Sequence, residues 1–349
     1  MRTGGVNAAR DGARRAGSIR SRSMGRDSPE LATDLAGIPL RSPVLLAAGT
    51  AGHLDELAGV VDLSRVGGIV TKSITPEPHE GNATWRITEC KAGMLNAIGL
   101  ANMGLDAFEA HVLPRVAGVP APVIGSVAGF SIDDYVRVAA SMDQCDVLAG
   151  VELNVSCPNV HAGTDFGADP AALRELVGQV RRVVARKRLL VKLPPAAIGT
   201  PHGIASIARA ATEGGGAPRG PCGRPGADAL CISNTIPAMA IDVRTRRPRL
   251  ANVTGGLSGP ALHPVALRLV YEAHRSVCRD AGVPIVGVGG VMRWEDAAEF
   301  ILAGASCVQV GTLLFADPGA VGAITRGLAR WVRSQGASSV RELVGAIRV

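Results

Sequence analysis

The sequence Val151-Glu-Leu-Asn-Val-Ser-Cys-Pro-Asn-Val160 joins a short apolar run to a cluster of polar and reactive side chains. Pro158 ends regular structure, so Asn154, Cys157 and Asn159 are expected in or beside a loop that follows a buried strand. In α/β folds the loops after the carboxyl ends of the strands carry the chemistry. A lone cysteine beside a turn is often only a core residue, but two flanking amides and a proline favour a functional loop.

Short apolar runs of the same kind recur along the chain and are continuous rather than alternating, which is typical of strands buried on both faces. The eight runs are residues 43–47, 68–70, 122–127, 151–153, 189–191, 229–232, 284–288 and 307–310. Helical patterns separate most of them, at 133–142, 170–186, 203–212, 264–279, 294–303 and 318–334. This alternation predicts a parallel sheet, and eight units predict a closed (β/α)8 TIM barrel. An open, doubly wound sheet is the alternative.

The residues that end these runs are mostly glycine, or polar and basic residues. They are Ala48-Gly49, Thr71-Lys72-Ser73, Ala128-Gly129, Asn154, Lys192, Ser233-Asn234-Thr235, Gly289-Gly290 and Gly311-Thr312. Because all eight segments follow the carboxyl ends of strands, we expect them on one rim of the barrel.

The composition indicates one large domain with a short basic tail. The chain has 349 residues, of which 47% are hydrophobic and only 3% aromatic, which disfavours an aromatic nucleic-acid platform. Residues 1–30 hold seven arginines and three acidic residues, and so carry more than half of the net charge of +7. We expect a disordered tail there, with a transit peptide as the alternative. Residues 31–349 are expected to form the single barrel domain, with insertions at 72–121, 214–226 and 235–258.

Seven cysteines are scattered singly, so neither a disulfide framework nor a zinc or iron–sulfur site is expected. We therefore expect no metal and a cytoplasmic location. No apolar run approaches the ~20 residues that a membrane span needs. Cys222, within the 214–226 insertion, is expected to be exposed and without function.

Glycines and lysines at the expected rim suggest a site for a phosphorylated, redox-active cofactor. Gly289-Gly290, Gly311-Thr312 and Gly259 would let backbone amides approach a phosphate, with tight strand-to-helix turns as the alternative. Lys72 and Lys192 end buried strands, where a cation needs an anionic partner. They could stabilise a reduced flavin, or form a salt bridge to Glu152.

The amides and the thiol suggest a planar heterocyclic substrate. Asn96, Asn154, Asn159 and Asn234 offer the alternating donors and acceptors that a pyrimidine ring requires, although each alone could be a turn residue. Cys157 could act as a nucleophile with His161, or as a general base with a lowered pKa.

The chain resembles the class 1 dihydroorotate dehydrogenases, which are flavin enzymes of pyrimidine biosynthesis, over residues 34–330. The motifs that carry this resemblance are Thr71-Lys-Ser73, Gly93-Met-Leu-Asn-Ala-Ile-Gly-Leu100, Glu152-Leu-Asn-Val-Ser-Cys-Pro-Asn159, Val191-Lys-Leu-Pro194, Ser233-Asn-Thr235, Thr254-Gly-Gly-Leu-Ser-Gly-Pro260 and Val288-Gly-Gly290. The sequences of the 96–100 and 255–260 segments are most similar to those of the NAD-linked B type rather than to those of the fumarate-linked A type.

The resemblance implies a role for each matching residue. Cys157 would be the base that removes the C5 proton of dihydroorotate while hydride passes from C6 to N5 of FMN. The substrate would be held by Lys72, Asn96, Ala97, Ile98, Gly99, Leu100, Asn154, Asn159, Asn234 and Thr235. FMN would be held by Ala48, Lys72, Ser73, Ser126, Asn154, Lys192, Ser233, Gly259, Gly289, Gly290, Gly311 and Thr312.

Two departures concern the cofactor site, because the family usually has serine where Ala48 stands and often asparagine where Ser126 stands. The B type also implies a homodimeric core and a partner subunit that carries FAD and an iron–sulfur cluster. Because aromatic residues are few, the positive charge lies mostly in the tail and no apolar run is long enough, we expect neither nucleic acid nor a membrane as a partner. The alternatives are a dihydropyrimidine dehydrogenase-like reductase of uracil or thymine, a tRNA-dihydrouridine synthase-like enzyme, and a flavin-free scaffold.

Overall fold

Eight parallel strands close into a barrel in the computed structural model, which describes residues 28–155, 166–195 and 202–349. Cys157 and Asn159, and nearly all of the expected 1–30 tail, lie outside the described residues. The barrel strands are β3 (Val44–Leu46), β4 (Gly68–Val70), β7 (Val123–Val127), β8 (Gly150–Asn154), β9 (Arg188–Leu193), β10 (Ala229–Ile232), β15 (Ile285–Val288) and β16 (Ala305–Val310). The predicted TIM barrel is confirmed, and the open sheet was the wrong alternative.

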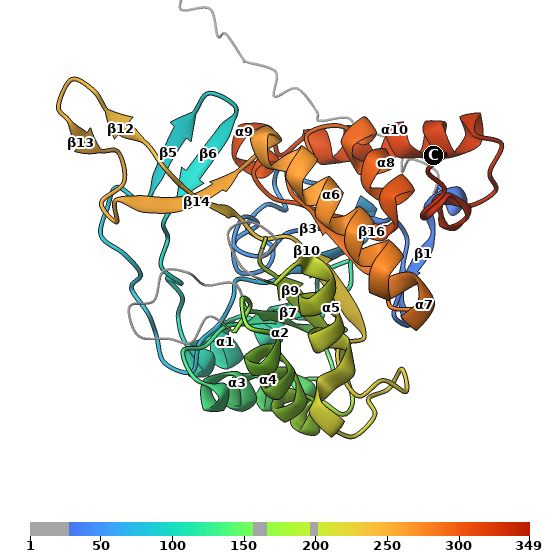
Figure 1. The fold of residues 1–349 in the computed structure, drawn as a ribbon, viewed down its shortest axis with the longest axis horizontal. Coiled ribbons are helices and arrows are strands. Elements are labelled where there is room, and N and C mark those ends of the chain that lie inside the picture. Colours follow the sequence, from blue (N-terminus) through green and yellow to red (C-terminus); the bar gives the residue numbers. More distant parts are fainter. Residues whose placement is uncertain (1–27, 156–165, 196–201) are drawn as a thin grey trace, which may run out of the picture.

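The helices surround the barrel, as Figure 1 shows. They are α1 (Leu105–His111), α2 (Leu113–Val116), α3 (Ile132–Gln144), α4 (Pro170–Val183), α5 (Ile204–Glu213), α6 (His263–Ala273), α7 (Arg279–Ala281), α8 (Trp294–Ala303), α9 (Leu313–Ala316) and α10 (Ala320–Ser334). Sequence signals set their starts: the Asp169 carboxylate caps α4 ahead of Pro170, and Ser131 and Asp134 form a capping box on α3. The expected 264–279 helix is interrupted by a π-helical turn at His274–Cys278.

A short hairpin fills the amino-terminal end of the barrel. It consists of β1 (Thr33–Leu35) and β2 (Ile38–Leu40), which pair antiparallel. Leu35 and Ile38 pack with Leu45 and Leu190 in the core cluster that occupies the barrel interior. Because this end is plugged, the open end lies at the carboxyl ends of the strands, where the polar residues gather.

Two of the three expected insertions pair with each other to form a second sheet beside the open end of the barrel (Figure 1). This overhanging sheet has the order β11 (Ile236–Met239), β14 (Thr254–Ser258), β6 (Gly93–Asn96) and β5 (Ile87–Cys90). A small hairpin of β12 (Ile241–Asp242) and β13 (Arg247–Pro248) extends from it. Asn96 pairs with Gly256, so residues far apart in the sequence form one wall. Among the described residues, no helix is both long enough and apolar enough to cross a membrane.

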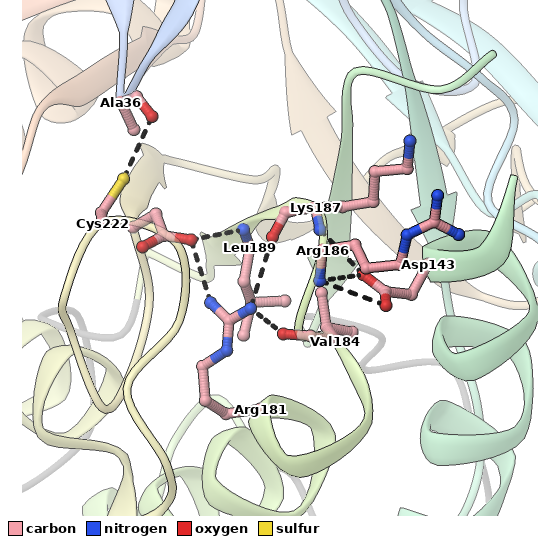
Figure 2. Close-up of polar contacts among 9 residues, drawn as sticks. Ala36, Asp143, Arg181, Val184, Arg186, Lys187, Leu189 and Cys222 are labelled. Atoms are coloured by element: carbon pink, nitrogen blue, oxygen red, sulfur yellow. Dashed lines mark hydrogen bonds and ion pairs between the residues drawn. The ribbon is translucent and has the colours of Figure 1, made fainter. Parts of the chain in front are cut away.

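A buried ion pair fixes the turn that starts β9, as Figure 2 shows. Arg181 Nη1 donates to Asp228 Oδ2 at 2.9 Å, and both side chains are fully buried. The same carboxylate oxygen accepts from the Leu189 amide at 2.9 Å, while the Arg181 guanidinium also donates to the Val184 carbonyl. From the other side, the Asp143 carboxylate accepts the Lys187 amide at 2.8 Å. The pair therefore aligns the strand whose far end carries Lys192.

The 214–226 insertion covers this ion pair. A Cβ added at Gly220 would lie 2.5 Å from the Arg181 guanidinium, so the loop packs directly against it. Cys222 is half-buried rather than exposed, and its thiol donates to the Ala36 carbonyl at 3.1 Å (Figure 2). Burial, together with the nearby Asp228 charge, raises the pKa of this thiol. The insertion thus ties β10 to the hairpin that plugs the barrel.

We predict that Asp228→Ala lowers the free energy of unfolding by about 3–5 kcal/mol, because it leaves the Arg181 charge buried without a partner. The measurement is denaturant unfolding of the flavin-free protein, with Glu272→Ala as the control. Glu272 pairs with Arg268 on the surface and should change stability by less than about 1 kcal/mol. Equal effects of the two substitutions would contradict the assigned role of the buried pair.

Candidate active site

A cavity of about 390 Å³ opens at the carboxyl ends of the barrel strands, beneath the overhanging sheet. Most residues that the sequence predicted for the site line this cavity. They are Ala48, Lys72, Ser73, Asn96, Ile98, Gly99, Leu100, Asn154, Lys192, Ser233, Asn234, Thr235, Gly259, Gly289, Gly290, Gly311 and Thr312. Cys157 and Asn159 lie outside the described residues, although Asn154 ends β8 just before them.

Two of the predicted residues do not line the cavity. Ala97 is buried in a small apolar cluster with Leu95 and Leu250, because it points to the opposite face from its neighbour Asn96. Ser126 is also fully buried, and its hydroxyl lies 2.8 Å from the Ser73 hydroxyl. Neither side chain contacts the cavity directly. Ala97 packs behind Asn96, and Ser126 contacts Ser73, which lines the cavity.

Further lining residues were not among the predicted ones. They are Ala47, Gly49, Thr50, Ile87, Met94, Gly256, Ser258, Leu262, Val288 and Phe315. Ile87, Met94, Gly256 and Ser258 lie on the overhanging sheet, so their position depends on a pairing between distant strands. Gly256 and Ser258 fall inside the motif at 254–260, which was the one available sequence signal for them.

A chain of hydrogen bonds links the polar side chains at the ends of four barrel strands. Asn234 Nδ2 donates to Asn154 Oδ1 at 3.2 Å, and Asn154 Nδ2 donates to Ser73 Oγ at 3.2 Å. The hydroxyls of Ser73 and Ser126 complete the chain. The carbonyl of Asn154 accepts from the Tyr135 hydroxyl at 2.9 Å. The orientation of each amide is therefore fixed by its neighbours, which pre-organises the cavity wall for a polar ring.

Lys72 is half-buried on the cavity wall and forms no ion pair with any of the described residues. Burial, followed in size by the positive charge of Arg86, lowers the pKa of Lys72. The alternative of a salt bridge to Glu152 is wrong for this lysine. Glu152 Oε2 instead accepts from Gln309 Nε2 at 2.8 Å and from the Cys231 thiol at 3.2 Å, deeper in the barrel. Lys72 is thus a desolvated cation suited to an anionic ligand.

Glycines shape the cavity wall at the ends of β15 and β16 for different reasons. Gly259 and Gly290 have φ values of 88° and 65°, a region that favours glycine, and a Cβ at Gly290 would lie 2.6 Å from the Gly259 carbonyl. At Gly311 a Cβ would meet no atom closer than 3.5 Å, so packing does not require glycine there. The space that Gly311 leaves open belongs to the cavity. Within the described residues, no three His, Cys, Asp or Glu side chains could hold a metal ion.

A closed barrel with a glycine-lined cavity and desolvated lysines at its carboxyl end is typical of barrel enzymes that bind a phosphorylated ligand. The profile of the dihydroorotate dehydrogenase family matches residues 30–332 of this chain. The chain therefore belongs to the dihydroorotate dehydrogenase family.

Curated relatives cover nearly the whole chain. A protein of Geotalea daltonii named dihydroorotate dehydrogenase B (NAD(+)), catalytic subunit, is 44% identical over 92% of this chain and 99% of its own length. The protein of the same name from Geobacter sulfurreducens has the same identity and coverage. A protein of Solibacter usitatus, provisionally named dihydroorotate dehydrogenase A (fumarate), is also 44% identical over 92% of this chain. The predicted resemblance to the B type is confirmed, and the A type lies at a similar distance.

The cavity fits the flavin on which this family depends. Lys72 offers a positive charge without an acidic partner among the described residues, which a flavin or its substrate can supply. The open space over Gly311, next to Thr312, leaves room for an anion to approach the backbone N–H groups. The two departures from the family's usual residues, Ala48 and Ser126, leave the cavity intact. Ala48 still lines it, and Ser126 still contacts Ser73.

We predict that Gly311→Ala leaves the flavin-free protein folded but weakens flavin binding by about tenfold or more, because the methyl group occupies ligand space. The measurements are the melting temperature of the flavin-free protein and the bound flavin after dialysis. Gly290→Ala is the comparison, since there the added methyl group meets backbone and should also lower stability. Full flavin retention by Gly311→Ala would contradict the assignment of the space over Gly311 to the flavin.

Proposed function

We propose that this chain oxidises dihydroorotate to orotate in pyrimidine biosynthesis, with FMN as the hydride acceptor. The observation that carries the proposal is that Lys72 shares one cavity with Asn96, Asn154 and Asn234. A carboxylated pyrimidine ring needs both a cation and alternating amide donors and acceptors, and a missing partner for either is costly. Family membership supports the same reaction.

The substrate would contact two kinds of group. Its ring N–H and C=O groups would meet the amides of Asn96, Asn154 and Asn234, with Thr235 beside them and Asn159 outside the described residues. Its carboxylate would meet Lys72 and the backbone of the 98–100 loop. Ala97 would act by holding that loop, because it packs away from the cavity.

FMN would lie against the strand ends on the glycine-rich wall. Its phosphate would meet the backbone at Gly289, Gly290, Gly311 and Thr312, where glycines permit close approach. Ser73, Asn154, Lys192, Ser233 and Gly259 would surround the remainder, and Lys192 is only 6% exposed. When bound, FMN supplies an acceptor for the hydride from C6 of the substrate.

Cys157 would act as the general base at C5. The substrate's C5–H bond breaks, its proton goes to the Cys157 thiolate, and the electron pair forms the C5–C6 double bond as hydride leaves C6. Cys157 follows Asn154 by three residues, and Asn154 lies on the cavity wall. The proposed base therefore follows, three residues along the chain, from a strand that ends on the cavity wall.

The experiment that tests the function is anaerobic mixing of the purified yellow protein with dihydroorotate. We expect the flavin absorbance to bleach, because hydride from dihydroorotate would reduce the flavin and, without oxygen, the reduced form would persist. Dihydrouracil, which lacks the carboxylate, should bleach it much more slowly. Faster bleaching by dihydrouracil than by dihydroorotate would instead support a dihydropyrimidine dehydrogenase-like activity.

We propose that NAD is the final acceptor and that a separate subunit with FAD and an iron–sulfur cluster delivers the electrons to it. The relatives' designation as catalytic subunits supports a partner. Scattered cysteines supply no quartet for a cluster in this chain. A homodimeric core and a cytoplasmic location belong to the same proposal. NAD reduction by the isolated chain at full rate would contradict it.

We predict that Cys157→Ala keeps the bound flavin but slows dihydroorotate oxidation near neutral pH by about 10²–10⁴-fold, the usual contribution of a positioned base. Cys157→Ser should recover part of the rate at high pH, because a hydroxyl is a much weaker acid than a thiol. The measurement is the rate of flavin bleaching from pH 6 to 10. A normal rate for Cys157→Ala would show that another group is the base.

A further inference from the structure

The 97–100 loop on the cavity wall is held from behind by the side chain and backbone of Asn82. Asn82 Nδ2 donates to the Ala97 carbonyl at 3.0 Å, and the Asn82 amide donates to the Ile98 carbonyl at 3.1 Å. A Cβ added at Gly99 would lie 2.6–2.8 Å from three atoms of Asn82. Asn82 thus packs directly on the side of the loop that faces away from the cavity.

Peptide geometry converts these two contacts into an orientation for two amides. In a trans peptide the carbonyl of one residue and the N–H of the next point in opposite directions. Because the carbonyls of Ala97 and Ile98 point to Asn82, the N–H groups of Ile98 and Gly99 point away from it. Both residues line the cavity, and neither amide has an acceptor among the residues that the structure describes.

The backbone after these amides is held in an unfavourable conformation. Gly99 has φ 72° and Leu100 has φ 55°, and the left-handed region is costly for leucine. Asn102 Nδ2 donates to the Leu100 carbonyl at 2.7 Å and to Thr75 Oγ1 at 2.8 Å, which anchors this conformation to the barrel rim. Such a loop presents successive N–H groups to an anion.

Asn82 is itself fixed by Arg86. The Arg86 Nε donates to the Asn82 carbonyl, and the Arg86 carbonyl accepts from the Ala97 amide at 2.8 Å. The segment 82–86 and the loop therefore form one hydrogen-bonded unit. The Arg86 guanidinium of this unit adds positive charge near Lys72, which lines the same cavity as the loop.

We infer that Asn82 is a positioning residue that aims the Ile98 and Gly99 amides at the substrate carboxylate and thereby selects carboxylated rings over neutral ones. The inference rests on the proposed function, which assigns a carboxylate to this cavity. Asn82 does not line the cavity and acts only through the loop. Asn102 supports the same loop from its other end.

The test compares two ligands in the flavin-loaded protein: orotate, which has the carboxylate, and uracil, which has the ring alone. Binding is followed by the change in flavin absorbance. Asn82→Ala should weaken orotate binding by about tenfold, since it removes the side-chain contact to the Ala97 carbonyl that orients the Ile98 amide, and the packing against Gly99. Uracil binding should change by less than about twofold. In turnover, KM should rise while kcat changes little.

A second substitution and a matched control keep the result clear. Asn82→Asp keeps a side chain of the same size packed against Gly99. It should nevertheless weaken orotate binding further, because a carboxylate replaces the amide that donates to the Ala97 carbonyl. Gln335→Ala truncates an exposed amide beyond the end of α10 and should change neither ligand.

Unaltered orotate binding by Asn82→Ala, or an equal loss for both ligands, would overturn the positioning role. The proposed function is tested separately by the unsubstituted protein. If dihydroorotate fails to bleach its flavin, the function fails, whatever Asn82 does.

Discussion

One electrostatic constraint governs the cavity: a lysine is taken out of water without an acidic partner among the described residues. Lys72 lies two residues beyond the end of β4, on the wall of a cavity of about 390 Å³, and burial lowers its pKa. Such a position costs free energy unless an anion completes it. The surrounding amides are neutral and mutually hydrogen-bonded, so the cation is left available for a ligand.

The rest of the fold holds this cavity open at one end and closes it at the other. The β1–β2 hairpin fills the amino-terminal end with Leu35 and Ile38. The Arg181–Asp228 pair fixes the start of β9, whose carboxyl end carries Lys192. On the open side, β6 and β14 join two distant insertions into a single wall. Stability and function are therefore built at opposite ends of the same strands, as is general for barrels of this class.

The barrel was predictable because strands buried on both faces leave continuous apolar runs in the sequence, and the residues that end them share one rim. The same logic brought Lys72, Asn154 and Asn234 to one cavity. Pairing between insertions left no such signal, because β6 and β14 are short and contain several glycines. The face of a residue on a short strand was equally hard to predict, which is why Ala97 was placed with Asn96 although the two point in opposite directions.

Asn82 illustrates a further limit. Its side-chain and backbone N–H groups donate to backbone carbonyls, and asparagine in a turn is common for local reasons. Its importance follows from which carbonyls it holds, and that depends on the fold of a loop fifteen residues further along the chain. Residues that act through a loop's backbone carry no motif of their own.

The most direct test of the central claim is the pH dependence of orotate binding, measured from pH 6 to 10 for the unsubstituted protein and for Lys72→Met. Orotate needs the charged form of Lys72, and a lowered pKa means that this charge is lost at a lower pH than for an ordinary lysine. We predict that the affinity advantage of the unsubstituted protein over Lys72→Met is large at pH 6 and shrinks as the pH rises. An advantage that is absent at pH 6, or that is unchanged up to pH 10, would contradict the account.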